Sequence, residues 1–144
     1  MTQQRVQLAL NVENIDEAVD YYSRLFGAKV NKRKPGYANF AIDEPPLKLV
    51  LFENPDAGER INHLGVEVFD EEGVAAATAR IVSAGIADKQ EIASTCCYAT
   101  QDKIWSSDPQ GLRWEWYRVL DDSETFFGET QSAASELTSP SCCS

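Results

Sequence analysis

The stretch Ile61–Val68, which reads INHLGVEV, decides the fold and contains the only histidine of the chain. Its aliphatic residues and Asn62 fall largely on one parity, whereas His63, Gly65 and Glu67 fall on the other. Because successive side chains of a strand point to opposite faces, this alternation predicts a strand with one apolar face and one cavity face. His63 is expected on the cavity face.

A second copy of this pattern lies near the N-terminus, at residues 5–12. There Gln7 belongs to the parity that alternates with four aliphatic residues, which are Val6, Leu8, Leu10 and Val12. Aligning the two copies places Gln7 over His63. The chain is therefore predicted to contain a structural repeat.

The same order of elements follows each copy. In the first half, Asn14 and Glu17 form a capping box that begins a helix, and Gly27 ends it. Further strands are predicted at residues 29–34, 37–42 and 47–52, and the second half repeats the order with a strand at 62–68, a helix at 71–84 and strands at 90–94, 103–107 and 112–119. The expected fold class is α+β, with two βαβββ modules at residues 4–53 and 61–119.

Length, composition and charge indicate the number of domains and exclude some classes of binding partner. The chain has 144 residues, which suits one compact domain, expected at residues 1–120, and residues 121–144 have the polar composition of a disordered tail. The net charge of -10 argues against binding to nucleic acid or to an anionic membrane. Neither a signal sequence nor a long apolar span is found, so we expect a cytoplasmic protein without membrane contacts.

The repeat also relates the last strands of the two modules, where Val50 corresponds to Glu115. Of the four equivalent cavity positions, Gln7, His63 and Glu115 can bind a metal. An imidazole nitrogen, a carboxylate and an amide oxygen suit a borderline or hard divalent cation and leave positions open for water, dioxygen or substrate. Two alternatives remain: Gln7 is only a hydrogen-bonding residue of the cavity, or Glu115 pairs with Arg113.

Four cysteines occur as two adjacent pairs, Cys96–Cys97 and Cys142–Cys143. Gln7 and His63 are 56 positions apart, whereas Val50 and Glu115 are 65 apart, so module two carries nine extra residues. We assign them to a loop at residues 94–102. Adjacent thiols favour soft centres such as trivalent arsenic, Cd(II) or Cu(I), whereas the predicted metal ligands are harder, so the thiols are expected to bind a substrate.

These features together resemble a known superfamily. Two βαβββ modules, Gln7 and His63 near the starts of equivalent strands, and Glu115 within the sequence LRWEWY at residues 112–117 are similar to the vicinal oxygen chelate proteins. That superfamily includes glyoxalase I, extradiol dioxygenases and antibiotic-resistance proteins, and the resemblance implies an open barrel. With the adjacent cysteines, the chain resembles the Fe(II)-dependent carbon-arsenic lyases and the related cadmium-induced proteins.

The resemblance implies a specific chemistry. Gln7, His63 and Glu115 would be the catalytic Fe(II) ligands, with Ni, Co, Mn or Cd as substitutes in vitro, and Cys96 and Cys97 would bind a trivalent organoarsenical. The reaction would use dioxygen to cleave the carbon-arsenic bond and release arsenite. No role is carried over for Cys142 or Cys143.

Two other functions stay open at this point. The cysteines of a binding protein would sequester cadmium or arsenite, whereas a glyoxalase-like isomerase or thiol transferase would hold Ni(II), Zn(II) or Mn(II) at the three ligands and leave the thiols idle. The oligomeric state is also open, because such modules pair within a chain or swap between the chains of a homodimer.

Overall fold

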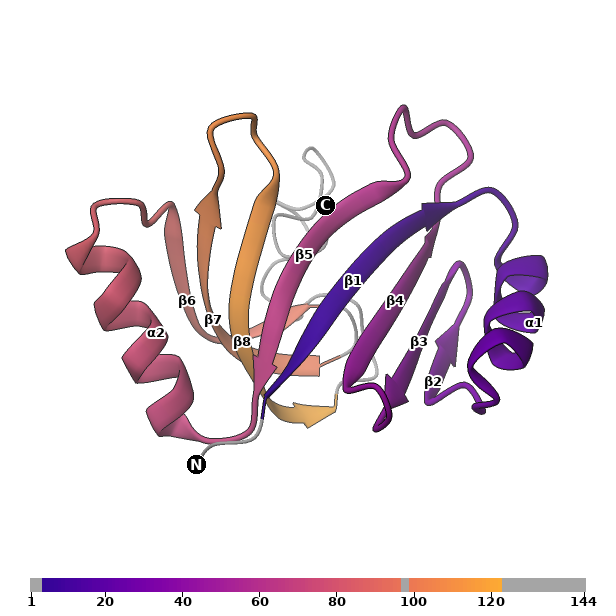
Figure 1. Cartoon of the computed structure of the whole chain (residues 1–144), viewed down its shortest axis with the longest axis horizontal. Coiled ribbons are helices and arrows are strands. Elements are labelled where there is room, and N and C mark those ends of the chain that lie inside the picture. The colour runs from indigo at the N-terminus through magenta and orange to yellow at the C-terminus, as the bar shows by residue number, and fades with distance from the viewer. Residues whose placement is uncertain (1–3, 97–98, 123–144) are drawn as a thin grey trace.

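A computed structural model describes residues 4–96 and 99–122, which form two βαβββ modules in one sheet (Figure 1). Module one consists of β1 (Gln4–Val12), α1 (Ile15–Phe26), β2 (Lys32–Lys34), β3 (Tyr37–Ile42) and β4 (Leu47–Glu53). Module two consists of β5 (Ile61–Val68), α2 (Glu71–Ser83), β6 (Lys89–Cys96), β7 (Ala99–Ser107) and β8 (Arg113–Asp122). The eight strands follow the order β2-β3-β4-β1-β5-β8-β7-β6, and the predicted fold class is confirmed.

The helix ends follow the predicted capping chemistry. Asn14 Oδ1 accepts a hydrogen bond from the backbone N–H of Glu17 at 3.0 Å, which satisfies a donor that the first turn of α1 leaves open. Gly27 ends α1 with a φ of 62°, a left-handed conformation that favours glycine. Asp70 caps α2 in the same way through the N–H of Gly73 at 2.7 Å. Neither helix is long and apolar enough to span a membrane, within the part of the chain that the structure describes.

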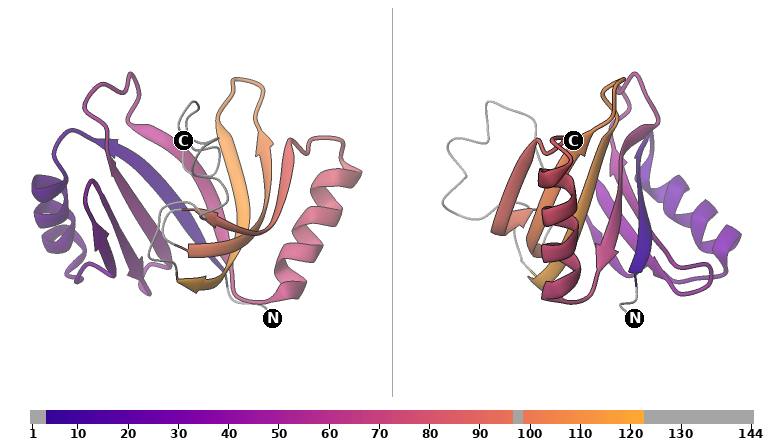
Figure 2. Two further views of the ribbon diagram at one scale, coloured as in Figure 1. Left: turned by 180° about the vertical axis from the view of Figure 1, so that it is seen from behind. Right: turned by 60° about the vertical axis from the view of Figure 1, so that its left-hand side comes forward.

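The two helices lie toward opposite ends of the curved sheet (Figures 1 and 2). Helix α1 packs on a core that includes Leu10, Phe40 and Leu51, while α2 packs through Ile81 on Ile104. On β1 and β4, the strand residues that contact α1 have the parity opposite to Gln7 and Val50. The helices therefore cover one face of the sheet and leave the other face to form a cavity.

The strand register reproduces the alignment of the repeat. In the antiparallel pair β1–β5, Gln7 lies opposite Gly65, and Ala9 lies opposite His63. In the parallel pairs, Ala9 lies beside Val50 and Gly65 lies beside Glu115. Gln7 and His63 therefore occupy equivalent positions about a pseudo-twofold axis, as do Val50 and Glu115.

The segment at residues 94–102 is not the loop that the sequence predicts. The equivalent cross-strand pairs Lys32–Asn39 and Lys89–Trp105 enclose hairpins that differ by nine residues in length, so the insertion lies in the β6–β7 hairpin. Strand pairing continues to Cys96 opposite Ala99, because the backbone ladder extends even where the side chains lack an alternating pattern. Residues 97–98, including Cys97, lie outside the described residues.

The last strand extends beyond its predicted end at residue 119. Strand β8 continues to Asp122, two residues into the segment expected as a tail. Residues 123–144, with Cys142 and Cys143, lie outside the described residues.

Candidate metal centre

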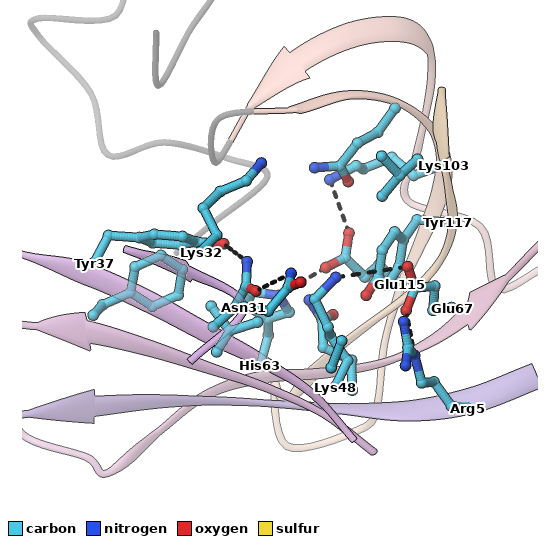
Figure 3. A pocket seen from close by; sticks show the side chains of 17 residues that line it. Arg5, Asn31, Lys32, Tyr37, Lys48, His63, Glu67, Lys103, Glu115 and Tyr117 are labelled. Carbon is cyan, nitrogen blue, oxygen red and sulfur yellow. Dashed lines mark hydrogen bonds and ion pairs between the residues drawn. The ribbon is translucent and has the colours of Figure 1, made fainter. Parts of the chain in front are cut away.

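The three predicted ligands come together from three strands. Gln7 on β1, His63 on β5 and Glu115 on β8 line one cavity of about 340 Å³ and are at most 7% exposed (Figure 3). His63 Nε2 lies 2.8 Å from Glu115 Oε2. A Cβ atom on Gly65 would lie 2.8 Å from both Gln7 Oε1 and Glu115 Cγ, so these two side chains occupy the space over Gly65. All three donors come from a single chain; the homodimer stays a prediction.

A chain of amide groups orients the ring of His63. Asn11 Nδ2 donates to the carbonyl oxygen of Glu59 at 3.0 Å, Asn62 Nδ2 donates to Asn11 Oδ1 at 3.1 Å, and Asn62 Oδ1 lies 2.8 Å from His63 Nδ1. A backbone carbonyl only accepts hydrogen bonds, so the carbonyl of Glu59 determines which group donates and which accepts in each of these three hydrogen bonds. His63 Nδ1 must therefore carry a proton and donate it to Asn62, which leaves Nε2 for the cavity.

Asn62 reaches His63 because of an irregularity in β5. The register shifts between Ala9 and Leu10, which pair with His63 and Ile61, so Asn62 is an extra residue in the strand. Such bulges redirect a side chain and are frequent beside functional sites. The sequence pattern places Asn62 on the apolar face, and its polar character among aliphatic neighbours was the only signal of this role.

The donor set fits a divalent cation. With Nδ1 protonated, His63 Nε2 and the carboxylate of Glu115 are two acceptors only 2.8 Å apart, which is unfavourable unless a proton or a cation lies between them. Gln7 Oε1 is buried and has no hydrogen-bond partner among residues 4–96 and 99–122. One nitrogen and two kinds of oxygen ligand suit a borderline or hard metal ion.

No group of three His, Cys, Asp or Glu side chains in the described part of the chain is placed to hold a metal. The candidate centre would instead take its third donor from the amide oxygen of Gln7. An amide binds a cation more weakly than a carboxylate or imidazole, so the correct geometry of His63 and Glu115 matters more here.

Lys103, not Arg113, is the close cationic partner of Glu115. Lys103 Nζ lies 2.9 Å from Glu115 Oε1, and both residues are 1% exposed. Burial alone raises the pKa of Glu115, but the charges of Lys103 and His63 outweigh it and lower the pKa overall, so the carboxylate is ionised. The guanidinium of Arg113, the partner considered from the sequence, stacks 4.7 Å above the ring centroid of Trp105.

Aromatic rings surround His63. The ring of Trp105 meets the imidazole edge-on at a centroid distance of 5.3 Å, and Phe52 lies 6.5 Å away. Trp105 Nε1 donates to Glu91 Oε2 at 3.0 Å, which connects β6 to the ring that holds His63. The hairpin that carries the cysteines is therefore mechanically linked to the candidate metal centre.

A second charged cluster lies farther along the same cavity (Figure 3). Glu67 accepts a hydrogen bond from Arg5 Nε at 2.7 Å and has Lys48 Nζ at 3.6 Å. Burial lowers the pKa of Lys48 despite the opposing charge of Glu67. Burial, reinforced by the charges of Glu67 and Glu115, raises the pKa of Tyr117 well above its ordinary value, so its hydroxyl stays protonated. The sequence analysis did not identify this cluster.

The two predicted substrate ligands cannot be placed in the cavity. Cys96 ends β6, but its side chain and all of Cys97 lie outside the described residues. Their role as substrate ligands stays a prediction.

The fold agrees with the comparison to known families. Residues 4–116 match the Glyoxalase/Bleomycin resistance protein/Dioxygenase superfamily. The chain belongs to this superfamily, which confirms the predicted relationship.

Individual relatives are more specific. The chain is 56% identical over 140 residues to the cadmium-induced protein CadI of Mycobacterium tuberculosis, covering 96% of this chain and 92% of the relative. It is 49% identical over 132 residues to the trivalent organoarsenical cleaving enzyme of Thermomonospora curvata, covering 90% and 86%. The Mn(II)-bound glyoxalase from Novosphingobium aromaticivorans shares the fold, with a TM-score of 0.59 and 19% identity over 88% of this chain and 44% of that chain.

Proposed function

We propose that this protein is an Fe(II)- and dioxygen-dependent enzyme that cleaves the carbon-arsenic bond of trivalent organoarsenicals, such as methylarsenite and aromatic arsenicals, and releases arsenite. The observation that carries the proposal is the convergence of His63 Nε2, Glu115 and Gln7 Oε1 in one buried cavity, where Gln7 Oε1 has no hydrogen-bond partner among the described residues. The 49% identity to a protein named as a trivalent organoarsenical cleaving enzyme supports the choice of substrate.

Gln7, His63 and Glu115 would hold the metal through one amide oxygen, one imidazole nitrogen and one carboxylate. A bound Fe(II) would supply the redox chemistry with dioxygen that breaks the carbon-arsenic bond. Asn62 keeps the Nδ1 proton of His63 in place, so that only Nε2 is presented to the cavity. The ammonium of Lys103 compensates the negative charge of the Glu115 carboxylate.

Cys96 and Cys97 would capture the arsenical. An organoarsenical with one carbon substituent and two hydroxyl groups forms two arsenic-sulfur bonds with two thiols and releases two water molecules. Adjacent residues can supply both sulfurs, and the hydrogen bond from Trp105 to Glu91, on the strand that ends at Cys96, supports a capture site near the metal centre. Inorganic arsenite would retain a third bond for another ligand.

The overall reaction balances for a methyl substrate. Methylarsenite and dioxygen, CH3As(OH)2 and O2, give As(OH)3 and formaldehyde. Arsenic stays trivalent, and the electrons that reduce dioxygen come from the methyl carbon. No additional reductant is therefore required.

The decisive experiment is aerobic incubation of the Fe(II)-loaded protein with methylarsenite, followed by chromatographic separation of the arsenic species. The proposal expects arsenite in molar excess over protein, together with formaldehyde, and neither product without dioxygen. Variant His63→Ala should release none. A wild-type protein that is loaded with iron but forms no arsenite would overturn the proposal.

A second candidate function is sequestration of cadmium or arsenite. It is favoured by the 56% identity to a protein named as cadmium-induced and by the two adjacent cysteine pairs. The same experiment separates the two functions, because a sequestering protein retains the arsenical at a fixed ratio and yields no product. Cadmium binding that is lost on replacing the cysteines, with no turnover in the wild type, would favour this second function.

A further inference from the structure

The cavity is positively charged although the protein is strongly acidic. The whole chain has a net charge of -10, yet the Lys, Arg, Asp and Glu residues of the described part that line the cavity are four basic and two acidic residues, namely Arg5, Lys32, Lys48, Lys103, Glu67 and Glu115. A divalent metal ion would add two further positive charges. A buried surplus of this sign is unfavourable unless the ligand supplies negative charge.

One of the two surplus charges lies in a second row of cavity residues beside the metal centre, formed by Arg5, Lys48, Glu67 and Tyr117. Arg5 lies opposite Glu67, and Glu67 lies beside Tyr117 in the neighbouring strand. Arg5 lies two residues before Gln7 on β1, Glu67 lies two residues after Gly65 on β5, and Tyr117 lies two residues after Glu115 on β8. Gln7, Gly65 and Glu115 form the row of the candidate metal centre. Two residues of a strand span about 7 Å, so the two rows are close enough for one small molecule to contact both.

The donors of this row are only partly satisfied. Among the described residues, Glu67 pairs with both Arg5 and Lys48, and Lys48 Nζ lies 3.6 Å from it, beyond a direct hydrogen bond. Lys48 is only 9% exposed. Tyr117 lines the cavity and is 2% exposed as a whole residue. Its hydroxyl has no hydrogen-bond partner in the described part of the chain.

Buried donors of this kind call for an acceptor. A carboxylate or phenolate would accept from the ammonium of Lys48 and the hydroxyl of Tyr117, while Arg5 would remain with Glu67. Figure 3 shows Lys48 and Tyr117 directed toward the interior of the same cavity as His63 and Glu115. The methyl group of methylarsenite is too small to reach this row from the metal centre.

We propose that Lys48 and Tyr117 form a subsite for an anionic group on the organic part of the substrate, so that aromatic arsenicals with an acidic substituent remote from arsenic are preferred. This inference rests on the proposed function for its substrate. The subsite itself is defined by the protein side chains and can be tested without turnover.

The kinetic test compares phenylarsenite with 4-carboxyphenylarsenite, using arsenite release by the Fe(II)-loaded enzyme. The wild type should have a roughly tenfold or greater kcat/KM for the carboxylated compound, mostly through a lower KM. Lys48→Gln should remove most of this preference, whereas Lys48→Arg should retain it. Lys29→Gln, which alters an exposed lysine outside the cavity, should leave the preference as in the wild type.

The binding test titrates benzoate and benzamide, two molecules of similar shape, into the metal-free protein by calorimetry. Benzoate should bind more tightly than benzamide to the wild type and to Lys48→Arg, but not to Lys48→Gln. Equal binding of the two compounds to the wild type, or a kcat/KM that does not depend on the carboxylate, overturns the subsite while leaving the proposed reaction intact. Absence of arsenite from every arsenical instead defeats the proposed reaction, and the titration then decides the subsite alone.

Discussion

Gly65 lies directly opposite Gln7 in the β1–β5 pair, and the position of its absent Cβ atom is 2.8 Å from Gln7 Oε1. The same position is 2.7 Å from the carbonyl oxygen of Glu115. Because Gly65 has no side chain, two of the three candidate ligands, Gln7 and Glu115, can lie close together above its backbone. Any larger residue would have to push them apart.

Gly65→Ala tests this arrangement. The added methyl group should displace Gln7 and Glu115, weaken metal binding and lower the free energy of unfolding by about 1–3 kcal/mol, as is typical of overpacking. Calorimetric titration with Co(II) and chemical denaturation would measure the two effects. Gly58→Ala is the matched control, because no atom of the described residues other than its chain neighbours lies within 4 Å of its added Cβ. Wild-type metal affinity in Gly65→Ala would contradict the assignment of the site.

Asn62→Leu should weaken metal binding roughly tenfold to a hundredfold, the usual effect of removing a residue that orients a histidine ligand. The reason is that His63 Nδ1 loses its acceptor, so the ring can rotate or move its proton to Nε2. Nitrogen-15 spectra of the Zn(II)-loaded protein should show a protonated Nδ1 and a metal-bound Nε2 in the wild type, and a mixture of the two ring forms in the variant. The exposed Asn54→Leu serves as the control, and a single unchanged tautomer in Asn62→Leu would disprove the role.

Lys103→Met should lower the free energy of unfolding of the metal-free protein by about 3–5 kcal/mol, because a buried carboxylate loses its cation. A bound divalent ion would replace part of that charge. The rise in Tm on adding metal should therefore be larger in Lys103→Met than in the wild type or in the exposed control Lys29→Met. An equal rise in all three proteins would show that Glu115 does not contact the metal.

The replacement of Cys96 and Cys97 by serine should separate arsenical capture from metal binding. The double variant should lose the phenylarsenite that the wild type retains through gel filtration, since both arsenic-sulfur bonds are removed. Its Co(II) affinity should remain within a factor of about three of the wild type, because the metal ligands are other residues. Replacement of Cys142 and Cys143 gives the matched control, and retention of arsenical by the Cys96/Cys97 variant would refute the assignment.

The pH dependence of stability should report on Lys48. Burial lowers the pKa of Lys48 from its ordinary value of 10.5, so the unfolded chain holds this proton more tightly than the folded protein does. The free energy of unfolding contributed by this group therefore rises with pH between the folded pKa and 10.5. Denaturation of the wild type and Lys48→Met at about pH 7 and about pH 9.5 should show the wild type gaining relative to the variant. Parallel behaviour would show that Lys48 is well solvated.

Much of this fold follows from patterns of period two. The alternation in residues 5–12 and 61–68 determines which side chains face the cavity, and a strand cannot exchange its faces without a shift in register. Gln7, His63 and Glu115 were predicted together for that reason. Capping residues such as Asn14 and Gly27 determined where α1 begins and ends.

The remaining features depend on contacts between strands. Asn62 turns toward His63 because β5 has one residue more than β1 at that point, which no pattern within β5 reveals. Lys103 meets Glu115 through the register of β7 against β8, which the predicted strands at residues 103–107 and 112–119 do not specify. The charged cluster around Glu67 likewise combines residues from four strands.

The two halves of the molecule have diverged at one decisive position. The pseudo-twofold axis makes Val50 the equivalent of Glu115, and the aliphatic side chain of Val50 offers no donor to a metal ion. An ion held by Gln7, His63 and Glu115 would therefore have one side without a protein ligand. This asymmetry between the two modules would leave coordination positions open to incoming reactants.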